Sequence, residues 1–426
     1  MLYIFVSLFA VLLVLNAAMV RTILFPSNLL CTVWLVSLLG LLASGTDFFP
    51  ISFETLLVFF VGATAFSVGG LLGLLVDENL SQRQNTAVDP FRKQFIDRLL
   101  NISFVVVLIG FPFYVQAMIG LAQSAELETF IYRVRQDMVG TSGETGFSVI
   151  SNLTVLSNYL AMAAWYENDG SVWNRRRAYL CVFVALAYGW LTGSKGAAVL
   201  LLMTLFFVHS MRARKVSPKA VVISLSLLAV AFSVGLLMVN LVFTTFESAE
   251  EMLVALVKGV QNYWLGGMVA FDQIVADTEA MESHHRIDRF FLQTANSFGG
   301  HFSVPSIHAE YSDITPLSNT DFFNTNVYTI YFSYFKDFGW AGAIILMAFL
   351  GFVLNIIFKR AELGRPIAVL LYSMTATGVV MTIYAETFWI GLNGYIKAFL
   401  FFALLYHFPL SMVPRNTREP LRKQAA

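Results

Sequence analysis

About eleven apolar runs divide the chain, and the segments that connect them alternate in the sign of their charge. A helix needs about 20 apolar residues to cross the hydrocarbon of a bilayer. Charged residues make up only 13% of the chain, against about 25% in a soluble domain. The sequence therefore predicts an all-α, polytopic integral membrane protein. The expected spans are 2–20, 28–43, 55–76, 99–122, 147–165, 178–192, 197–211, 221–243, 339–358, 366–384 and 393–409.

The charges indicate which side of the membrane each connection occupies. Most of the 27 Lys and Arg fall in one set of connections, and most of the 27 Asp and Glu fall in the other. Positively charged loops stay in the cytoplasm, so the N-terminus is expected outside and the C-terminal tail inside. The basic set is Arg21, 77–98, 166–177, 212–220, 359–365 and 410–426, and the acidic set is dominated by 123–146 and 244–324.

Three parts follow from this order. Residues 1–243 hold the first eight spans and an outside loop at 123–146. Residues 244–324 form a large outside loop, expected to be the main soluble element, and an outside loop of this length usually carries function. Residues 325–426 hold the last three spans and a cytoplasmic tail.

Several kinds of chemistry are not expected. Cys31 and Cys181 lie inside apolar runs, so no disulfide framework is predicted. The Gly-Ser-Lys-Gly at 193–196 lacks the upstream glycine and the downstream Ser or Thr of a P-loop. His284 and His285 are adjacent and have no convincing third ligand nearby, so no metal site is predicted. Neither a cofactor nor a nucleic-acid partner is expected.

Some basic residues fall on the acidic, outside set of connections. One interpretation is local pairing, as between Lys336 and Asp337. Together, however, these cations suit a phosphate or pyrophosphate at the outer membrane surface, because Arg offers a planar fork and Lys a point charge. Lys397 lies within an apolar run, a depth at which ionisable groups tend to mark substrate paths. The outside cations are Arg133, Arg135, Lys195, Lys258, Arg286, Arg289, Lys336 and Lys397.

Two of these arginines begin the same short pattern. Gly146 follows Arg135 after ten intervening residues, and Gly300 follows Arg289 at the same interval. With these patterns in two outside loops, the chain resembles the O-antigen polymerase (Wzy) family of oligosaccharide repeat-unit polymerases. The order of spans and loops is also similar to that of the family. Two further similar stretches are Leu191-Thr192-Gly193-Ser194-Lys195-Gly196 and Asn326-Val327-Tyr328-Thr329 leading to Asp337-Phe338-Gly339-Trp340-Ala341-Gly342.

This resemblance implies a GT-C-like fold in a bacterial inner membrane, with the active site facing the periplasm. The implied reaction transfers a growing glycan from its undecaprenyl pyrophosphate carrier to the non-reducing sugar of a single lipid-linked repeat unit. The implied partners are the undecaprenyl-pyrophosphate-linked oligosaccharide, the lipid bilayer and a co-polymerase that regulates chain length.

Such a transfer makes two demands on the protein. Cations must absorb the charge that develops on the departing pyrophosphate, and the acceptor hydroxyl needs a base or an oriented hydrogen-bond acceptor. For the first role we expect Arg133, Arg135, Lys195 and Arg289, with Gly146 and Gly300 completing the motifs. For the second role the candidates are His301, His308 and Glu310, and the alternative is that these three belong to a polar periplasmic surface.

Other polar residues favour structural roles. Residues 325–335 are expected to form an interfacial helix in an aromatic belt. Asp337 would then cap the N-terminus of the span at 339–358, and Glu386 is expected to be structural in a short outside turn. Ser148, Ser151, Asn152, Ser157 and Asn158 give one helix face a polar stripe. That stripe could line a lumen or join neighbouring helices.

Two other functions compete with a polymerase. An O-antigen ligase shares the architecture and the donor but uses a different acceptor. A flippase or transporter of the lipid-linked unit usually shows internal repeats with broken helices at matching positions, and no repeat of fixed period is found here.

Overall fold

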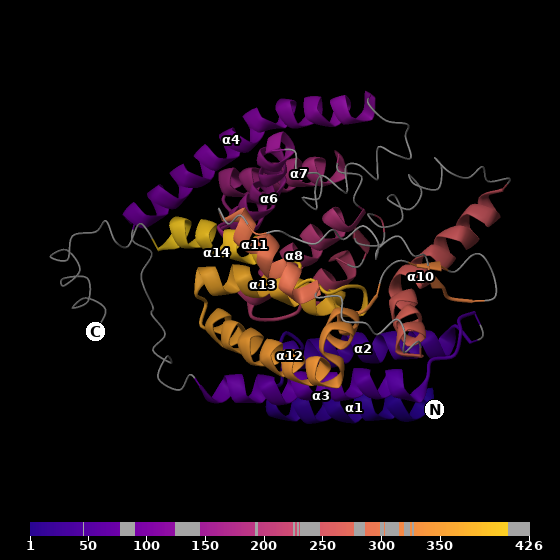
Figure 1. Cartoon of the computed structure of the whole chain (residues 1–426). Helices are drawn as coiled ribbons and strands as arrows, with labels where there is room; N and C mark the ends of the chain where they lie inside the picture. The colour runs from indigo at the N-terminus through magenta and orange to yellow at the C-terminus, as the bar shows by residue number, and fades with distance from the viewer. Residues whose placement is uncertain are drawn as a thin grey trace.

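The computed structural model describes residues 1–45, 47–76, 90–123, 145–191, 195–224, 226–227, 230, 248–276, 286–298, 302, 315–318, 324–325 and 328–407 (Figure 1). Helices make up nearly all of this part of the chain. They are α1 (Leu2–Met19), α2 (Pro26–Ala43), α3 (Phe53–Leu75), α4 (Pro90–Gln123), α6 (Thr145–Tyr166), α7 (Val172–Leu191), α8 (Lys195–Ala213), α10 (Ala249–Ala276), α11 (Arg286–Ser297), α12 (Ile330–Glu362), α13 (Pro366–Val380) and α14 (Leu392–Tyr406). Strands β1 (Thr315–Pro316) and β2 (Asn324–Thr325) form a short antiparallel pair.

Seven of the described helices are long and apolar enough to span a membrane: Leu2–Met19, Pro26–Ala43, Phe53–Leu75, Arg92–Gly120, Gly196–Ala213, Ile330–Glu362 and Pro366–Ile383. This confirms an all-α, multi-pass membrane protein. Helix α14 is apolar but shorter. Most of the expected span at 221–243 lies outside the described residues, so the number eleven stays a prediction.

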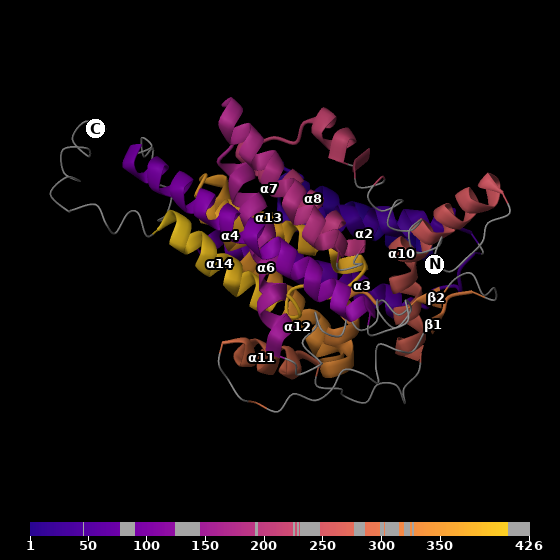
Figure 2. The ribbon, with the colours of Figure 1, turned by 90° about the horizontal axis from the view of Figure 1, so that it is seen from above.

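The buried apolar side chains form two cores. The first lies among α1, α2, α3, α10 and α12, and the second lies among α4, α6, α7 and α14. Helices α8 and α13 contribute to both, for instance through Phe207 and Val369 to the first core and Leu205 and Leu370 to the second. Figure 1 shows α1 and α3 of the first group side by side at the bottom and α4 of the second group at the top, and Figure 2 shows α4 beside α6.

Helices α3 and α12 pack with their backbones in close contact. A Cβ on Gly69 would lie 1.9 Å from the Ala348 carbonyl oxygen, and one on Gly351 would lie 2.0 Å from that of Phe66. Small residues allow membrane helices to approach in this way, because lipid supplies no hydrophobic force to drive them together. This contact fixes the position of α12, on which much of the candidate site depends.

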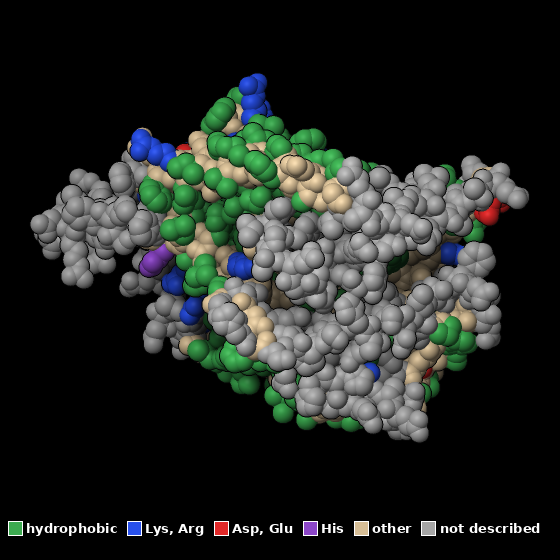
Figure 3. Space-filling model, turned by 45° about the horizontal axis from the view of Figure 1, so that its top comes forward, with side chains coloured by type: hydrophobic (Ala, Val, Ile, Leu, Met, Phe, Trp, Pro, Cys, Tyr) green, Lys and Arg blue, Asp and Glu red, His purple; other side chains and the backbone are tan. Residues whose placement is uncertain are grey.

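Hydrogen bonds gather several helix ends into one group. Lys359 Nζ donates to the Leu74 carbonyl at 2.9 Å, which joins the ends of α12 and α3. Arg92 donates to the carbonyl of Tyr406, which joins the start of α4 to the end of α14. We call this the basic end, at the left of Figure 1, and define it by Arg92, Lys93, Arg212, Arg214, Lys359 and Arg360. In Figure 3 most of the visible Lys and Arg lie toward the same side, beside a surface of hydrophobic side chains.

The opposite end holds connections from the acidic, outside set. The Phe49 N–H donates to the Leu317 carbonyl at 2.8 Å, and Gln273 Nε2 donates to the Pro316 carbonyl at 2.5 Å. Asp272 accepts both the N–H and the hydroxyl of Ser52, the N-cap residue of α3. We call this the loop end, defined by Phe49, Ser52, Asp272, Gln273, Pro316 and Leu317.

The second half of α10 departs from the expectation of a soluble loop at 244–324. Leu265, Met268, Val269 and Phe271 are buried in the first core, against α2 and α3. The apolar run in this half of α10 is too short to be recognised as a membrane span, so hydropathy does not predict that these residues are buried.

The aromatic residues at 328–335 are also not where the sequence predicts. Tyr331 and Tyr334 are fully buried in the first core rather than placed in an interfacial belt. Their hydroxyls are satisfied there, because Tyr331 donates to the Phe59 carbonyl at 3.1 Å and Tyr334 to Glu386 at 3.2 Å. A buried Tyr needs such a partner, and only the folded chain supplies it.

Helix α12 turns sharply at one glycine. Gly339 has φ 57° and ψ −145°, a conformation outside the helical range, so the segment from Ile330 to Phe338 meets the rest of α12 at a kink. Residues other than glycine rarely adopt this backbone region. The kink lies between the predicted interfacial helix at 325–335 and the body of the predicted span at 339–358.

Candidate functional site

Most of the predicted site residues lie outside the described part of the chain. This holds for Arg133, Arg135, Gly300, His301, His308 and Glu310. Gly146, Lys195 and Arg289 have described backbones, at the starts of α6 and α8 and in α11, but the Lys195 and Arg289 side chains are not described. The site is therefore built from the elements that position these residues.

Helices α6 and α8 both begin toward the loop end. Tyr166, the last residue of α6, donates its hydroxyl to Gly364, which follows α12 at the basic end. Arg212, in the last turn of α8, donates to the carbonyl of Asn168 beside it. Since these helices end at the basic end, their first residues lie away from it. Gly146 and Lys195 thus begin their helices on the side of the outside connections.

Asp337 caps a helix, though not the one expected. Its Oδ2 accepts the backbone N–H of Ile287 at 2.8 Å, in the first turn of α11. A carboxylate there satisfies an otherwise unpaired N–H and is favoured by the helix dipole. The prediction that Asp337 caps its own span is wrong because the kink at Gly339 directs this carboxylate to α11. Arg289 belongs to the same turn of α11.

Packing holds α11 in the same place. The Ile287 side chain is buried in the first core. Further along the helix, the Phe291 ring lies 5.3 Å from that of Trp389, which itself stacks 6.2 Å from Phe349 of α12. Helix α11 is thus fixed against α12 and α14 by both a cap and aromatic contacts (Figure 2).

Glu386 is a buried carboxylate surrounded by donors. It accepts the backbone N–H groups of Phe388, Trp389 and Ile390 and the hydroxyl of Tyr334, at 2.7 to 3.2 Å. Burial raises the pKa of the Glu386 carboxyl above its usual value, and these hydrogen bonds oppose the rise. It organises the turn before α14 and links that turn to α12. The expected structural role agrees with this geometry.

A hydrogen bond joins α14 to the polar stripe of α6. Lys397 Nζ donates to Oδ1 of Asn152 at 2.9 Å. Helix-to-helix bonding was one of the two interpretations of the stripe, and this bond supports it at Asn152. The sequence signals were present, a Lys inside an apolar run and an Asn on the stripe, but nothing in the sequence pairs the two residues.

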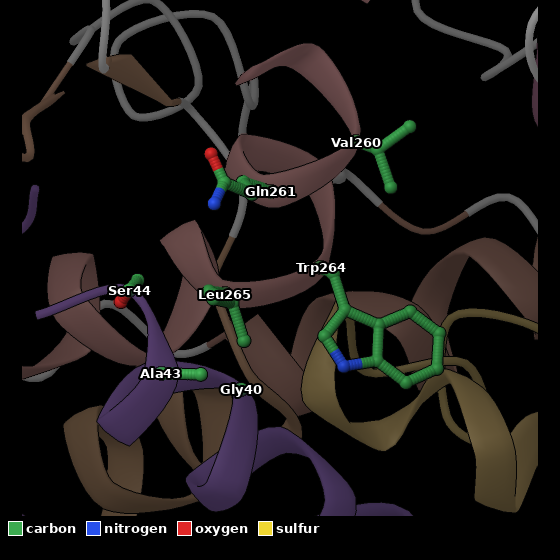
Figure 4. A pocket seen from close by; sticks show the side chains of 7 residues that line it. All are labelled: Gly40, Ala43, Ser44, Val260, Gln261, Trp264 and Leu265. Carbon is green, nitrogen blue, oxygen red and sulfur yellow. The ribbon is translucent and has the colours of Figure 1, made fainter. Parts of the chain in front are cut away.

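A pocket of about 310 Å³ opens between the end of α2 and the middle of α10 (Figure 4). Leu265 lies over Gly40 in it, with 3.2 Å between a Leu265 methyl group and the position of a Gly40 Cβ. Among the described residues, the lining offers no ionisable group and therefore no obvious acid, base or anion ligand. It consists of Gly40, Ala43, Ser44, Val260, Gln261, Trp264 and Leu265.

Within the described residues, no group of three or more His, Cys, Asp and Glu is arranged to hold a metal ion. The arrangement offers instead a capped helix that carries Arg289, a kinked span and a cation, Lys397, that bridges α14 and α6. Compared with known families, with characterised proteins and with solved structures, the chain has no match in any of the three.

Proposed function

We propose that this protein is a glycosyltransferase of the inner membrane that polymerises lipid-linked oligosaccharide repeat units on the periplasmic face, with undecaprenyl pyrophosphate as the leaving group. The proposal starts from the resemblance of its Arg-x10-Gly, Thr-Gly-Ser-Lys-Gly and Asp-Phe-Gly stretches to the O-antigen polymerases. The multi-pass helical fold is compatible with it.

One observation carries the proposal beyond sequence resemblance. The hydrogen bond from Ile287 to Asp337, 50 residues apart in the chain, joins the Asp-Phe-Gly stretch to the helical turn in which the Arg289-x10-Gly300 stretch begins. The first turn of α11, which contains Arg289, is therefore attached to the Asp-Phe-Gly kink of α12. Motifs that act together must lie together, and this contact supports a shared role for them.

In the proposed reaction, the anomeric carbon of the growing glycan leaves the pyrophosphate oxygen and bonds to the acceptor hydroxyl oxygen. Arg133, Arg135, Lys195 and Arg289 would stabilise the charge that develops on the departing pyrophosphate. His301, His308 or Glu310 would accept the hydroxyl proton. Transfer from a lipid pyrophosphate requires no nucleotide sugar, since the carrier itself is the activated donor.

The test is the size of lipid-linked and surface glycan in the native host after the gene is deleted. We expect single repeat units, with long polymer restored by the wild-type protein and not by an Arg135→Ala/Arg289→Ala variant present at equal level. Lys215→Ala is the matched control, because Lys215 is an exposed cation just after α8, near the basic end, and it should restore full length.

Two results would contradict the proposal. Full-length polymer that accumulates on the lipid carrier would indicate a ligase. Single units that stay on the cytoplasmic face would indicate a flippase.

A further inference from the structure

Lys397 lies in the second turn of α14, and its side chain is partly buried. Its ammonium group donates one hydrogen bond, to Oδ1 of Asn152 on α6. An ammonium has three donors and Asn is neutral. Within the described residues, this contact therefore leaves the charge without a counter-ion and further donors available for a ligand.

A buried cation elsewhere in the described part of the chain has a counter-ion. Arg177 is 5% exposed and is paired with Asp97 at 2.6 Å, with further bonds to Asn101 and Asn174. For Lys397, by contrast, no carboxylate of the described residues lies within 4.0 Å of the ammonium. A cation left in this way among apolar helices favours an anionic ligand.

The depth of Lys397 follows from the packing of α6 on α14. The Tyr159 hydroxyl donates to the Gly394 carbonyl at 2.5 Å, and nearer the basic end the rings of Tyr166 and Tyr406 lie 6.1 Å apart. The two helices therefore run in the same direction. Lys397 is on the half of α14 that faces away from the basic end, which the charge distribution assigns to the outer leaflet.

An apolar stripe continues from Lys397 along α14. Leu400 and Leu404 follow it at intervals of three and seven residues, so the three side chains share one helix face. Leu400 is 52% exposed and Leu404 is 48% exposed. This face thus has a cation toward the outer side and apolar side chains deeper in the bilayer. The two parts match the phosphate head and the hydrocarbon chain of a lipid.

We infer that Lys397, held in place by its bond to Asn152, binds the phosphate of a lipid in the outer leaflet, whose hydrocarbon chain lies along Leu400 and Leu404. The ammonium would pair with a phosphate oxygen. The site is separate from the arginines of the proposed reaction. Its role in the enzyme, but not the binding itself, rests on the proposed function: there the site would be a lateral docking position for the lipid-linked substrate.

The test uses the full-length protein in nanodiscs of phosphatidylcholine that contain a small fraction of polyprenyl phosphate. Native mass spectrometry counts the polyprenyl phosphate retained by the wild-type protein, by Lys397→Met and by Lys397→Arg. We expect retention to be about tenfold weaker in Lys397→Met, as for the loss of one charge-assisted contact, and largely preserved in Lys397→Arg. Lys215→Met is the control for loss of a cation outside the site, and it should bind as the wild type does.

Two further arms distinguish the source of the phosphate. Phosphatidylglycerol in place of polyprenyl phosphate shows whether an ordinary phospholipid headgroup is bound in the same Lys397-dependent way, which would also support a lipid-phosphate site. Inorganic phosphate that displaced the lipid at millimolar concentration would contradict it, because the chain contacts would then contribute nothing.

Equal retention of lipid by Lys397→Met and wild type, at equal thermal stability, would overturn the inference and leave Lys397 as a cation that reaches for the interface. If Lys397→Met unfolds, Leu400→Asp/Leu404→Asp replaces it as the test, since it keeps the cation and removes the apolar path. Glycan length is not used as the readout, so failure of this site and failure of the proposed polymerase remain separate results.

Discussion

Asp337 of α12 accepts the backbone N–H of Ile287 in α11 at 2.8 Å, and the kink at Gly339 begins two residues after the Asp. One short stretch therefore both redirects a membrane-spanning helix and holds the helix that carries Arg289. Four predictions follow from this relationship and from the other contacts of the helical bundle.

Asp337→Ala should loosen α11 without unfolding the bundle. Loss of a capping acceptor costs about 1 kcal/mol, which corresponds to about fivefold faster hydrogen exchange at the first turn of α11 if that turn opens locally. Hydrogen exchange with mass spectrometry on peptides covering 286–298 measures this. Asp337→Asn keeps an acceptor oxygen and should retain most of the protection. Equal exchange in Asp337→Ala and wild type would show that aromatic packing alone holds α11.

Gly339→Ala should destabilise the protein although space is open around it. No atom lies within 4 Å of a Cβ built on Gly339, so the penalty comes from the backbone conformation alone and amounts to about 1–3 kcal/mol. Gly120→Ala is the matched control, because Gly120 also has open space but lies within α4 without positive φ. Thermal unfolding in detergent should show a lower midpoint for Gly339→Ala only. Equal midpoints would mean that the kink can relax to a helix.

The two ion pairs of α4 should differ in their effect on stability. Asp97→Asn leaves the Arg177 guanidinium buried without its counter-ion, and since the Asp97 side chain is 33% exposed we expect a loss of about 1–3 kcal/mol. Asp169→Asn removes the partner of Lys93 in a pair whose side chains are 38% and 47% exposed, and should cost less than about 1 kcal/mol. Thermal midpoints of the two variants measure the difference. A larger loss in Asp169→Asn would contradict the assigned roles.

Glu167 should make stability depend on pH near the basic end. Burial raises the pKa of its carboxyl above the ordinary 4.5, and the neighbouring Arg212 only partly opposes the rise. The folded-state pKa lies above the unfolded value. The contribution of Glu167 to folding stability is therefore complete below about pH 4.5 and is lost as pH rises through the folded pKa. Glu167→Gln removes this dependence, so its midpoint relative to wild type should rise as pH increases from 4.5 to neutrality. A constant difference across that range would refute the assignment.

The membrane-spanning helices could largely be predicted from the sequence. In lipid each helix must satisfy its own backbone hydrogen bonds, and it needs a long run of apolar residues, which is visible in the sequence. The burial of Leu265 to Phe271 and of Tyr331 and Tyr334 could not. These residues are too few or too polar to form a hydropathy signal, and their burial depends on partners such as Phe59 and Glu386 from distant helices.

In the candidate site, too, single residues could be recognised from the sequence, but their partners could not. Lys397 stands out in the sequence as a charge in an apolar run, but its partner Asn152 lies 245 residues away. Asp337 was recognisable as a capping residue, yet the helix it caps could be identified only from the folded backbone. The predicted His301, His308 and Glu310 lie outside the described residues, so their roles stay predictions.

Product length in a purified system tests the central claim most directly. The protein in liposomes is given the single lipid-linked repeat unit of its own host, without nucleotide sugar, and the glycan is separated by size. The account predicts a ladder of lipid-linked polymers from the wild-type protein, and single units only from the Arg135→Ala/Arg289→Ala variant. Unchanged single units with the folded wild-type protein, alone and with a chain-length-regulating partner, would contradict it.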